Sequence, residues 1–292
     1  MFSDWPIIVS WWLLLFALGV LCLPLTLTLF SKFWDKGYSF AKIIAILLTS
    51  YLVWLLGSLK LIPFSQKSSW VIVIFLGIVN FAIFKQKKRL KIKNLIKNNE
   101  RIWVAEEILF FVCLLFWSFI RGFQPNIQGL EKFMDYGFIN SILRTQFFPP
   151  RDMWMSAETI NYYYFGHLVT AVLTKLSGFD SAITYNLMMA TIFAFCFSAA
   201  FSLGANLVSL INKEKKFIIL GGIFSTLLLN LGGNLQLLWY FFKNKTLFGY
   251  WYPDATRFIV QKFGGQDNTI HEFPLYSFVV ADLHGHLLDL PF

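Results

Sequence analysis

The sequence predicts an all-α fold, a polytopic bundle of transmembrane helices. Of its 292 residues, 57% are hydrophobic and 14% are charged, whereas a soluble domain carries about 25% charged residues. Several apolar runs approach the roughly 20 residues that a helix needs to cross a bilayer. The 34 Phe and 11 Trp residues are too many for one water-surrounded core. This composition excludes a soluble enzyme, a disordered chain and a nucleic-acid-binding module.

The formal net charge of +9 is concentrated in one stretch. Eight of the 25 basic residues lie within 85–101, where the only acidic residue is Glu100. A dense basic run can be a nucleic-acid patch. Between two apolar segments, however, it is typical of a cytoplasmic loop under the positive-inside rule. We therefore expect 85–101 to be a cytoplasmic loop and expect no nucleic-acid partner.

Four apolar runs in the first half, at about 5–30, 41–62, 69–84 and 102–120, predict four spans. The first is too long and too aromatic for a signal peptide and has no cleavage site. Lysine bias puts the loops 31–42 and 85–101 inside, so the N-terminus and the segment 121–164 lie outside. We expect an integral protein of the plasma membrane. Its predicted regions are an N-terminal three-span region, 1–101, and a core, 102–292.

The outer segment 121–164 contains a predicted amphipathic helix over 130–147, which we expect to lie along the membrane surface. Phe148-Pro149-Pro150 ends it, because the residue before a proline is pushed out of the helical region. Apolar residues recur in it at three- and four-residue spacing, namely Leu130, Phe133, Met134, Phe138 and Ile142.

Three further apolar runs cover about 165–178, 181–210 and 217–242, and they allow two topologies. If all three cross, the second polar segment, 243–286, lies inside. If 165–178 is a re-entrant or interfacial helix, 243–286 joins 121–164 outside. The run 165–178 is short for a span and contains Lys175, so we favour the second arrangement. A new apolar run begins at 287–292, so we expect the sequence to be part of a longer protein.

Titratable residues gather in the two outer segments, which makes a shared site a candidate. Glu131 and Asp135 are four residues apart and share one helix face. Two close carboxylates can hold a metal ion, or one can act as a base with a raised pKa. The alternative is the solvated polar face of an interfacial helix.

The stretch 151–167 combines charged and aromatic residues at a membrane boundary. Such residues are typical of an aromatic belt, which composition alone favours. They could equally form a platform for a sugar or a lipid headgroup, with phenol groups bonding ligand hydroxyls. The candidate substrate-binding residues here are Arg151, Asp152, Trp154, Asn161, Tyr162, Tyr163, Tyr164 and His167.

A second constellation comprises Glu272 and the motif Asp282-Leu283-His284-Gly285-His286. In an extended conformation His284 and His286 point the same way beside Asp282, and the three could hold a divalent metal ion with open positions. On a helix the two histidines diverge, and the motif would be a hydrogen-bonding scaffold. The spacing His-x-His alone is a weak signal.

The stretches 129–167 and 272–292, together with 23–58, resemble the YYY-domain membrane proteins. That family occurs in archaea and diverse bacteria, is named for its tyrosine triplet, and has no established function. Its wider relationship is to the GT-C glycosyltransferases, which use lipid-phosphate-linked sugars. The resemblance implies a GT-C-like fold. This chain has Glu-x-x-x-Asp where that superfamily commonly has adjacent Asp-Glu, which leaves open which carboxylate is the base.

The resemblance implies a membrane glycosyltransferase that takes a sugar from a polyprenyl-phosphate-linked donor at the outer membrane face. Asp135 or Glu131 would be the catalytic base, and Arg151 and Arg257 would bind phosphate. Trp154, Tyr162, Tyr163 and Tyr164 would line the sugar or lipid groove. Asp282, His284 and His286 would close the site and could hold a divalent ion, and Glu272 would bind substrate. The alternatives are a transporter or flippase and a non-catalytic membrane protein. A non-catalytic scaffold would leave the Glu131/Asp135 cluster far from the Asp282/His284/His286 cluster. The distance between the two clusters therefore distinguishes a shared catalytic site from a scaffold.

Overall fold

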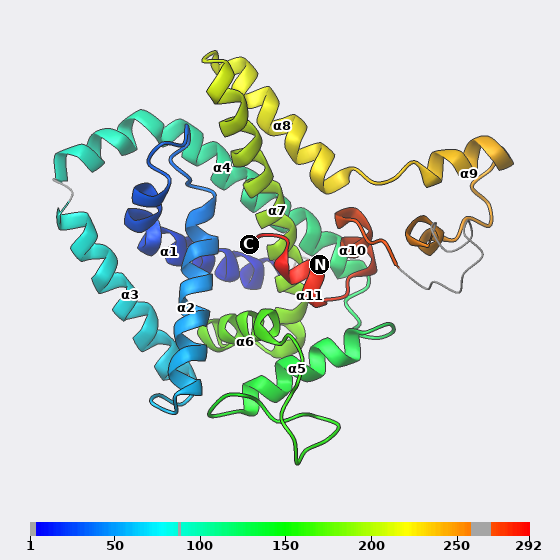
Figure 1. Ribbon diagram of the computed structural model, residues 1–292, viewed down its shortest axis with the longest axis horizontal. Helices are drawn as coiled ribbons and strands as arrows, with labels where there is room; N and C mark the ends of the chain where they lie inside the picture. The colour runs from blue at the N-terminus through cyan, green and yellow to red at the C-terminus, as the bar shows by residue number, and fades with distance from the viewer. Residues whose placement is uncertain (1–3, 87–88, 258–269) are drawn as a thin grey trace.

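The computed structural model describes residues 4–86, 89–257 and 270–292, which form an all-α fold (Figure 1). Its helices are α1 (Trp5–Leu29), α2 (Phe40–Ser58), α3 (Gln66–Gln86), α4 (Arg89–Phe123), α5 (Lys132–Arg144), α6 (Phe165–Ser177), α7 (Ser181–Ile211), α8 (Lys215–Leu231), α9 (Gln236–Asn244), the 3-10 helix η2 (Tyr252–Thr256), α10 (Pro274–Val280) and α11 (Gly285–Asp289).

Five of these helices are long and apolar enough to cross a membrane, namely α1, α2, α3, α7 and the Lys97–Phe123 part of α4. The bent pair α8 and α9 makes a sixth if it is counted as one span. The chain is an integral membrane protein with several candidate spans. The spans predicted at 5–30, 41–62, 69–84, 102–120 and 181–210 are confirmed, with ends that shift by a few residues.

The stretch 85–101, predicted as a loop, is helical in all of its described residues. The helix α3 ends at Gln86, and α4 begins at Arg89 and continues without a break into its span. Lys, Arg and Glu are good helix formers, so a basic stretch outside the apolar layer can extend a span as helix. The proposed boundary between 101 and 102 therefore falls inside α4.

The run 217–242 is not one straight helix. It divides into α8 and α9, whose axes differ by 66°. Gly232 and Gly233 stand between them, and glycine is unfavourable inside a helix because it loses the most backbone entropy. Figure 1 shows α9 turned away from the end of α8.

The central helix is α7, which is buried along nearly all of its length. Asp180 caps its first turn, because the carboxylate accepts a hydrogen bond from the backbone N–H of Ala182 at 2.8 Å. On its inner face Phe193 stacks on Trp117 of α4, with ring centroids 4.4 Å apart. These contacts fix α4 against the centre of the bundle.

The helices α7 and α8 form a closely packed antiparallel pair (Figure 1). A Cβ atom on Gly204 would lie 2.8 Å from the Gly221 carbonyl oxygen, and one on Gly222 would lie 2.7 Å from the Phe201 ring. Small residues let transmembrane helices approach this closely, since lipid offers no hydrophobic drive for their association. The pair returns the chain to the side where α7 began, so the described parts of the second polar segment, 243–257 and 270–286, lie on the same side of the bundle as 121–164.

The helices α5 and α6 fill the space below the start of α7. The helix α5 ends at Arg144, four residues before Phe148, so the prediction of 130–147 is too long and the prolines do not end the helix. Its residues Phe138 and Ile142 are buried, whereas Leu130 and Phe133 are exposed. The helix α6 has 13 residues, lies mostly in the core and is not a candidate span.

A buried polar network joins α1, α2 and α4 away from these segments. Lys42 pairs with Glu107, whose other carboxylate oxygen accepts from the Trp12 indole at 2.8 Å. Glu106 accepts from the Ser39 hydroxyl at 3.0 Å. A charge inside a membrane is costly unless it is paired, so these contacts hold the three helices in register.

The topology predicts which introduced cysteines share a side of the membrane. Cysteines at Ser156 and Thr246 should react with an impermeant thiol reagent from the same side, and a cysteine at Glu214 should react from the other. All three positions are exposed, and the native Cys22, Cys113 and Cys196 are buried and should stay silent. Labelling of Ser156→Cys and Thr246→Cys from opposite sides would contradict the fold.

The close contact between α7 and α8 predicts a steric effect. Gly204→Leu should lower stability by about 1–3 kcal/mol, because the new side chain meets the α8 backbone. Thermal unfolding of the purified protein in detergent measures this. Leu203→Phe, at the exposed neighbouring position, is the control and should leave the melting temperature nearly unchanged.

Candidate functional site

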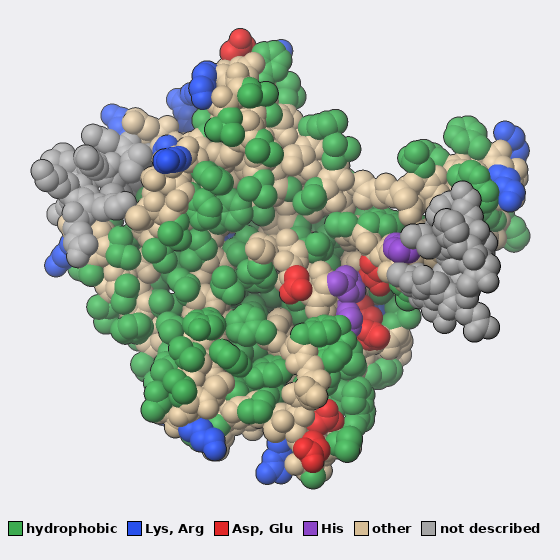
Figure 2. Space-filling model, viewed as in Figure 1, with side chains coloured by type: hydrophobic (Ala, Val, Ile, Leu, Met, Phe, Trp, Pro, Cys, Tyr) green, Lys and Arg blue, Asp and Glu red, His purple; other side chains and the backbone are tan. Residues whose placement is uncertain are grey.

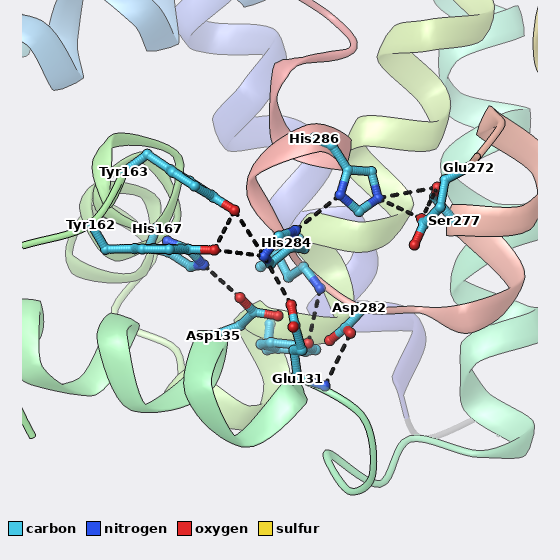
Figure 3. A network of polar contacts seen from close by, with 12 residues as sticks. Glu131, Asp135, Tyr162, Tyr163, His167, Glu272, Ser277, Asp282, His284 and His286 are labelled. Carbon is cyan, nitrogen blue, oxygen red and sulfur yellow. Dashed lines mark hydrogen bonds and ion pairs between the residues drawn. The ribbon is translucent and has the colours of Figure 1, made fainter. Parts of the chain in front are cut away.

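Three segments distant in sequence meet beside the start of α5, and their polar side chains form one network (Figure 3). They are the start of α5, the turn before α6, and the continuous segment of α10, the loop 281–284 and α11. Figure 2 shows Asp, Glu and His side chains gathered in one patch of an otherwise largely hydrophobic face. The two clusters predicted from the sequence therefore come together.

The backbone turns sharply just before each of two carboxylates. Leu130, with φ 50°, precedes Glu131, and Ala281, with φ 57°, precedes Asp282. Residues other than glycine rarely adopt this left-handed conformation, and such strain gathers at functional sites. The second turn is held in place by Phe278 of α10, which packs edge-on against Phe193, with ring centroids 5.0 Å apart.

Asp135 and Asp282 form a buried carboxyl pair. Asp135 Oδ1 lies 2.9 Å from His167 Nε2, and Asp282 Oδ2 accepts the backbone N–H of Glu131 at 3.2 Å. Their remaining oxygens are buried and receive no hydrogen bond from any described N–H or hydroxyl group. Each of the two carboxyl groups affects the pKa of the other. Facing carboxyl groups satisfy each other only if one holds a proton.

The environment keeps this pair partly protonated near neutral pH. Burial raises the pKa of Asp135 to about 7, and burial together with the neighbouring Asp135 raises the pKa of Asp282 to about 7. Burial lowers the pKa of His167 to about 4, so that imidazole is neutral at pH 7. A carboxyl pair that exchanges a proton near the working pH is suited to acid–base chemistry.

His284 joins Glu131 to the tyrosines. Its Nε2 atom lies 2.9 Å from Glu131 Oε2 and 3.1 and 3.0 Å from the hydroxyl groups of Tyr162 and Tyr163. The two tyrosine hydroxyls also hydrogen-bond each other. Burial lowers the pKa of His284, against the opposing effect of the Glu131 charge.

The network continues from His284 to His286 and Glu272. The Nδ1 atoms of the two histidines are 3.0 Å apart, so one ring donates and the other accepts. His286 Nε2 lies 2.7 Å from Glu272 Oε2, which also accepts from the Ser277 hydroxyl at 2.8 Å. The hydrogen bond with Glu272 raises the pKa of His286. A continuous hydrogen-bonded path thus runs from the tyrosines to Glu272.

A cleft of about 610 Å³ opens beside this network. The Glu131 side chain is 57% exposed, whereas Asp135 is fully buried behind it. Glu131 is therefore the carboxylate that a molecule in the cleft meets first. The polar residues that line the cleft are Glu131, Arg257, Glu272, Ser277, Asp282, His284 and His286.

Residues 48–292 match the family described as Uncharacterized membrane protein (DUF2298). The chain belongs to this family. No curated protein and no solved structure matches it. The matched range includes every residue of the network and the cleft, so the site lies wholly within the DUF2298 region.

Several residues predicted to bind substrate lie outside the network. Tyr164 accepts a hydrogen bond from the Trp54 indole at 3.0 Å, so the tyrosine triplet divides between the site and α2. The Asp152 carboxylate accepts the backbone N–H groups of Trp154 and Met155 and shapes a local turn. The side chains of Arg151, Trp154 and Asn161 are exposed.

Arg257 does line the cleft, as the sequence predicts for a residue of the site. Its guanidinium lies over the Trp251 ring, 4.9 Å from the centroid, and Nη1 donates to the Pro253 carbonyl at 3.2 Å. Part of the second polar segment, 258–269, lies outside the described residues.

The predicted metal set does not assemble. Among the described residues, no group of three His, Cys, Asp or Glu side chains is arranged to hold a metal ion. Asp282 faces Asp135 and the Glu131 backbone, whereas His284 and His286 bond to each other, because α11 begins between them at Gly285. Asp282, His284 and His286 therefore act as members of a hydrogen-bonded network.

Sequence reasoning missed Ser277 and Tyr185. Ser277 completes the contact between Glu272 and His286, and the Tyr185 hydroxyl accepts the Leu283 backbone N–H at 3.1 Å. Ser277 lies five residues after Glu272, within the same motif, which could have indicated it. Tyr185 sits in an apolar helix, and nothing in the sequence links it to residue 283.

The raised pKa values predict a pH-dependent stability. A carboxyl whose folded pKa exceeds its unfolded value stabilises the fold at low pH, and this is lost as pH rises from about 4 through about 7. Asp282→Asn keeps a hydrogen-bonding amide but cannot ionise. Its melting temperature relative to wild type should therefore increase from pH 5 to pH 8. Asp152→Asn, in the exterior turn, should show no such trend; equal trends would refute the buried pair.

Proposed function

We propose that the protein is a membrane glycosyltransferase of GT-C type that transfers a sugar from a polyprenyl-phosphate-linked donor to an acceptor hydroxyl at the outer membrane face. The proposal rests on one observation, the convergence of Glu131, Asp135, Asp282 and His284 beside a cleft. The likeness of the sequence motifs to YYY-domain proteins, and through them to the GT-C enzymes, supports the choice of reaction.

In this proposal Glu131 is the general base. Its exposed carboxylate takes the proton of the acceptor hydroxyl, whose oxygen attacks the anomeric carbon of the donor sugar. The bond from that carbon to the phosphate oxygen breaks, and polyprenyl phosphate leaves with the electron pair. The proton on Glu131 can pass to His284, whose Nε2 atom is 2.9 Å away.

Asp135 has a positioning role in this scheme. Its side chain is buried, and Asp282, whose pKa it raises, accepts the Glu131 backbone N–H. Arg257 lies at the cleft and carries the positive charge that a departing phosphate needs. Arg151 is an exposed residue of the loop after α5, so Arg257 is the better supported of the two predicted phosphate ligands.

A second candidate is a transporter or flippase for a lipid-linked precursor. The observation that favours it is the presence of Lys42, Glu106 and Glu107 within candidate spans, because intramembrane charges often mark transport pathways. Lys42 and Glu107 are, however, paired with each other and also contact Tyr38 and Trp12. That closed set of contacts favours a structural role for these two charges.

The base assignment predicts the effect of removing one charge. Glu131→Gln should lower sugar transfer by at least about 100-fold, the usual range for loss of a general base. Transfer is measured with labelled polyprenyl-phosphate sugars and the full-length protein in proteoliposomes. Glu158→Gln, at an exposed loop residue, is the matched control and should retain wild-type transfer. Unchanged transfer in Glu131→Gln would reject this assignment, and unchanged transfer in Asp135→Asn as well would reject any role of the carboxylate pair as the base.

A further inference from the structure

A second cavity lies between α1, α4 and α7, and none of its lining residues lines the cleft described above. It is an open groove of about 630 Å³, within the usual range for small-ligand sites. Its walls come from three candidate spans and are mostly apolar. The main apolar residues are Trp5, Ile8, Phe116, Phe119, Ile183 and Leu187.

One buried cation lines this groove. Arg121, near the end of α4, is 8% exposed, and its Nε and Nη2 atoms donate to Asn186 Oδ1 at 3.0 and 2.7 Å. Asn186 is itself fixed, because its amide nitrogen donates to the carbonyls of Pro125 and Ala182 at 3.0 Å each. Asp4 also lines the groove. Among the described residues, the side-chain hydrogen bonds of Arg121 go to the neutral Asn186 amide. A buried cation held by a neutral amide is stabilised when an anion joins it.

We propose that this groove binds polyprenyl phosphate, with the isoprenoid chain along the apolar walls and the phosphate at Arg121. Arginine suits this ligand, because its planar guanidinium donates to phosphate oxygens in a forked geometry. An apolar groove between spans suits a chain that lies in the bilayer. The inference deepens the proposed function, since the same chemistry belongs to the donor lipid and to its product.

The groove and the catalytic network are adjacent. Burial and the charge of Arg121 lower the pKa of Lys132 in the first turn of α5, and Asp282 raises it, so Lys132 lies within electrostatic range of both. On α7, Asn186 accepts a hydrogen bond from Arg121. The adjacent residue, Tyr185, accepts one from the Leu283 backbone N–H. Arg121 and the loop 281–284 therefore contact neighbouring residues of α7.

Binding of polyprenyl phosphate, of the matching polyprenol and of inorganic phosphate tests the headgroup contact. We expect wild-type protein in nanodiscs to prefer polyprenyl phosphate to polyprenol, and Arg121→Gln to bind polyprenyl phosphate about tenfold more weakly or worse, with that preference lost. Arg121→Lys should restore part of it. Arg101→Gln, an exposed arginine on the same helix, is the control. An unchanged preference in Arg121→Gln, or competition by inorganic phosphate as strong as by polyprenyl phosphate, would overturn the proposal.

The groove walls give a second, independent measurement. Ile183→Trp should fill the groove and weaken binding of both the phosphate and the alcohol, whereas Leu207→Trp, on the exposed side of the same helix, should not. Equal affinities in the two variants would overturn the groove assignment. Binding is measured without transfer, so a protein that binds the lipid through Arg121 but moves no sugar contradicts the proposed function alone.

Discussion

The antiparallel contact between α7 and α8 is the constraint on which the site depends. Glu131 and Asp282 are 151 residues apart and meet only because the chain crosses with α7 and returns with α8. The glycines at this crossing let the two backbones approach, which lipid alone does not drive. Since α6 is too short to cross, each polar segment emerges beside the other, and the cleft forms between them.

The structure uses its buried charges in two different ways. In the spans, Lys42 and Glu107 neutralise each other, and their contacts stabilise the packing of α1, α2 and α4. At the end of the bundle, no Lys or Arg among the described residues pairs with Asp135 or Asp282, and burial raises the pKa of each to about 7. A closed ion pair is suited to fixing a fold. A carboxyl pair with pKa values of about 7 is suited to proton exchange. Asp135 and Asp282, rather than Lys42 and Glu107, are therefore the buried charges suited to acid–base chemistry.

The sequence predicted the spans well because length and hydropathy decide them. It also predicted that the two polar clusters could meet, from their composition alone. It could not predict pairings over long separations, such as Lys42 with Glu107 or Tyr185 with Leu283, because these follow from helix packing. The division of the tyrosine triplet depends on the turn into α6, which no periodicity reveals. The sequence contains Gly232 and Gly233, where the helix breaks. The long apolar run around them nevertheless predicted one continuous segment, 217–242.

The protonation of the carboxyl pair bears directly on how a phosphate could approach. If Glu131, Asp135, Asp282 and Glu272 were all ionised, four negative charges would repel an anionic headgroup. A proton on Asp135 or Asp282 removes one of these charges. The contact with Glu272 raises the pKa of His286, which favours the charged imidazolium that offsets Glu272. Lys132 lies within electrostatic range of Arg121 and of Asp282, and Arg257 lines the cleft. The balance of charge then favours an anion at the edge of the cleft, beside the exposed carboxylate of Glu131.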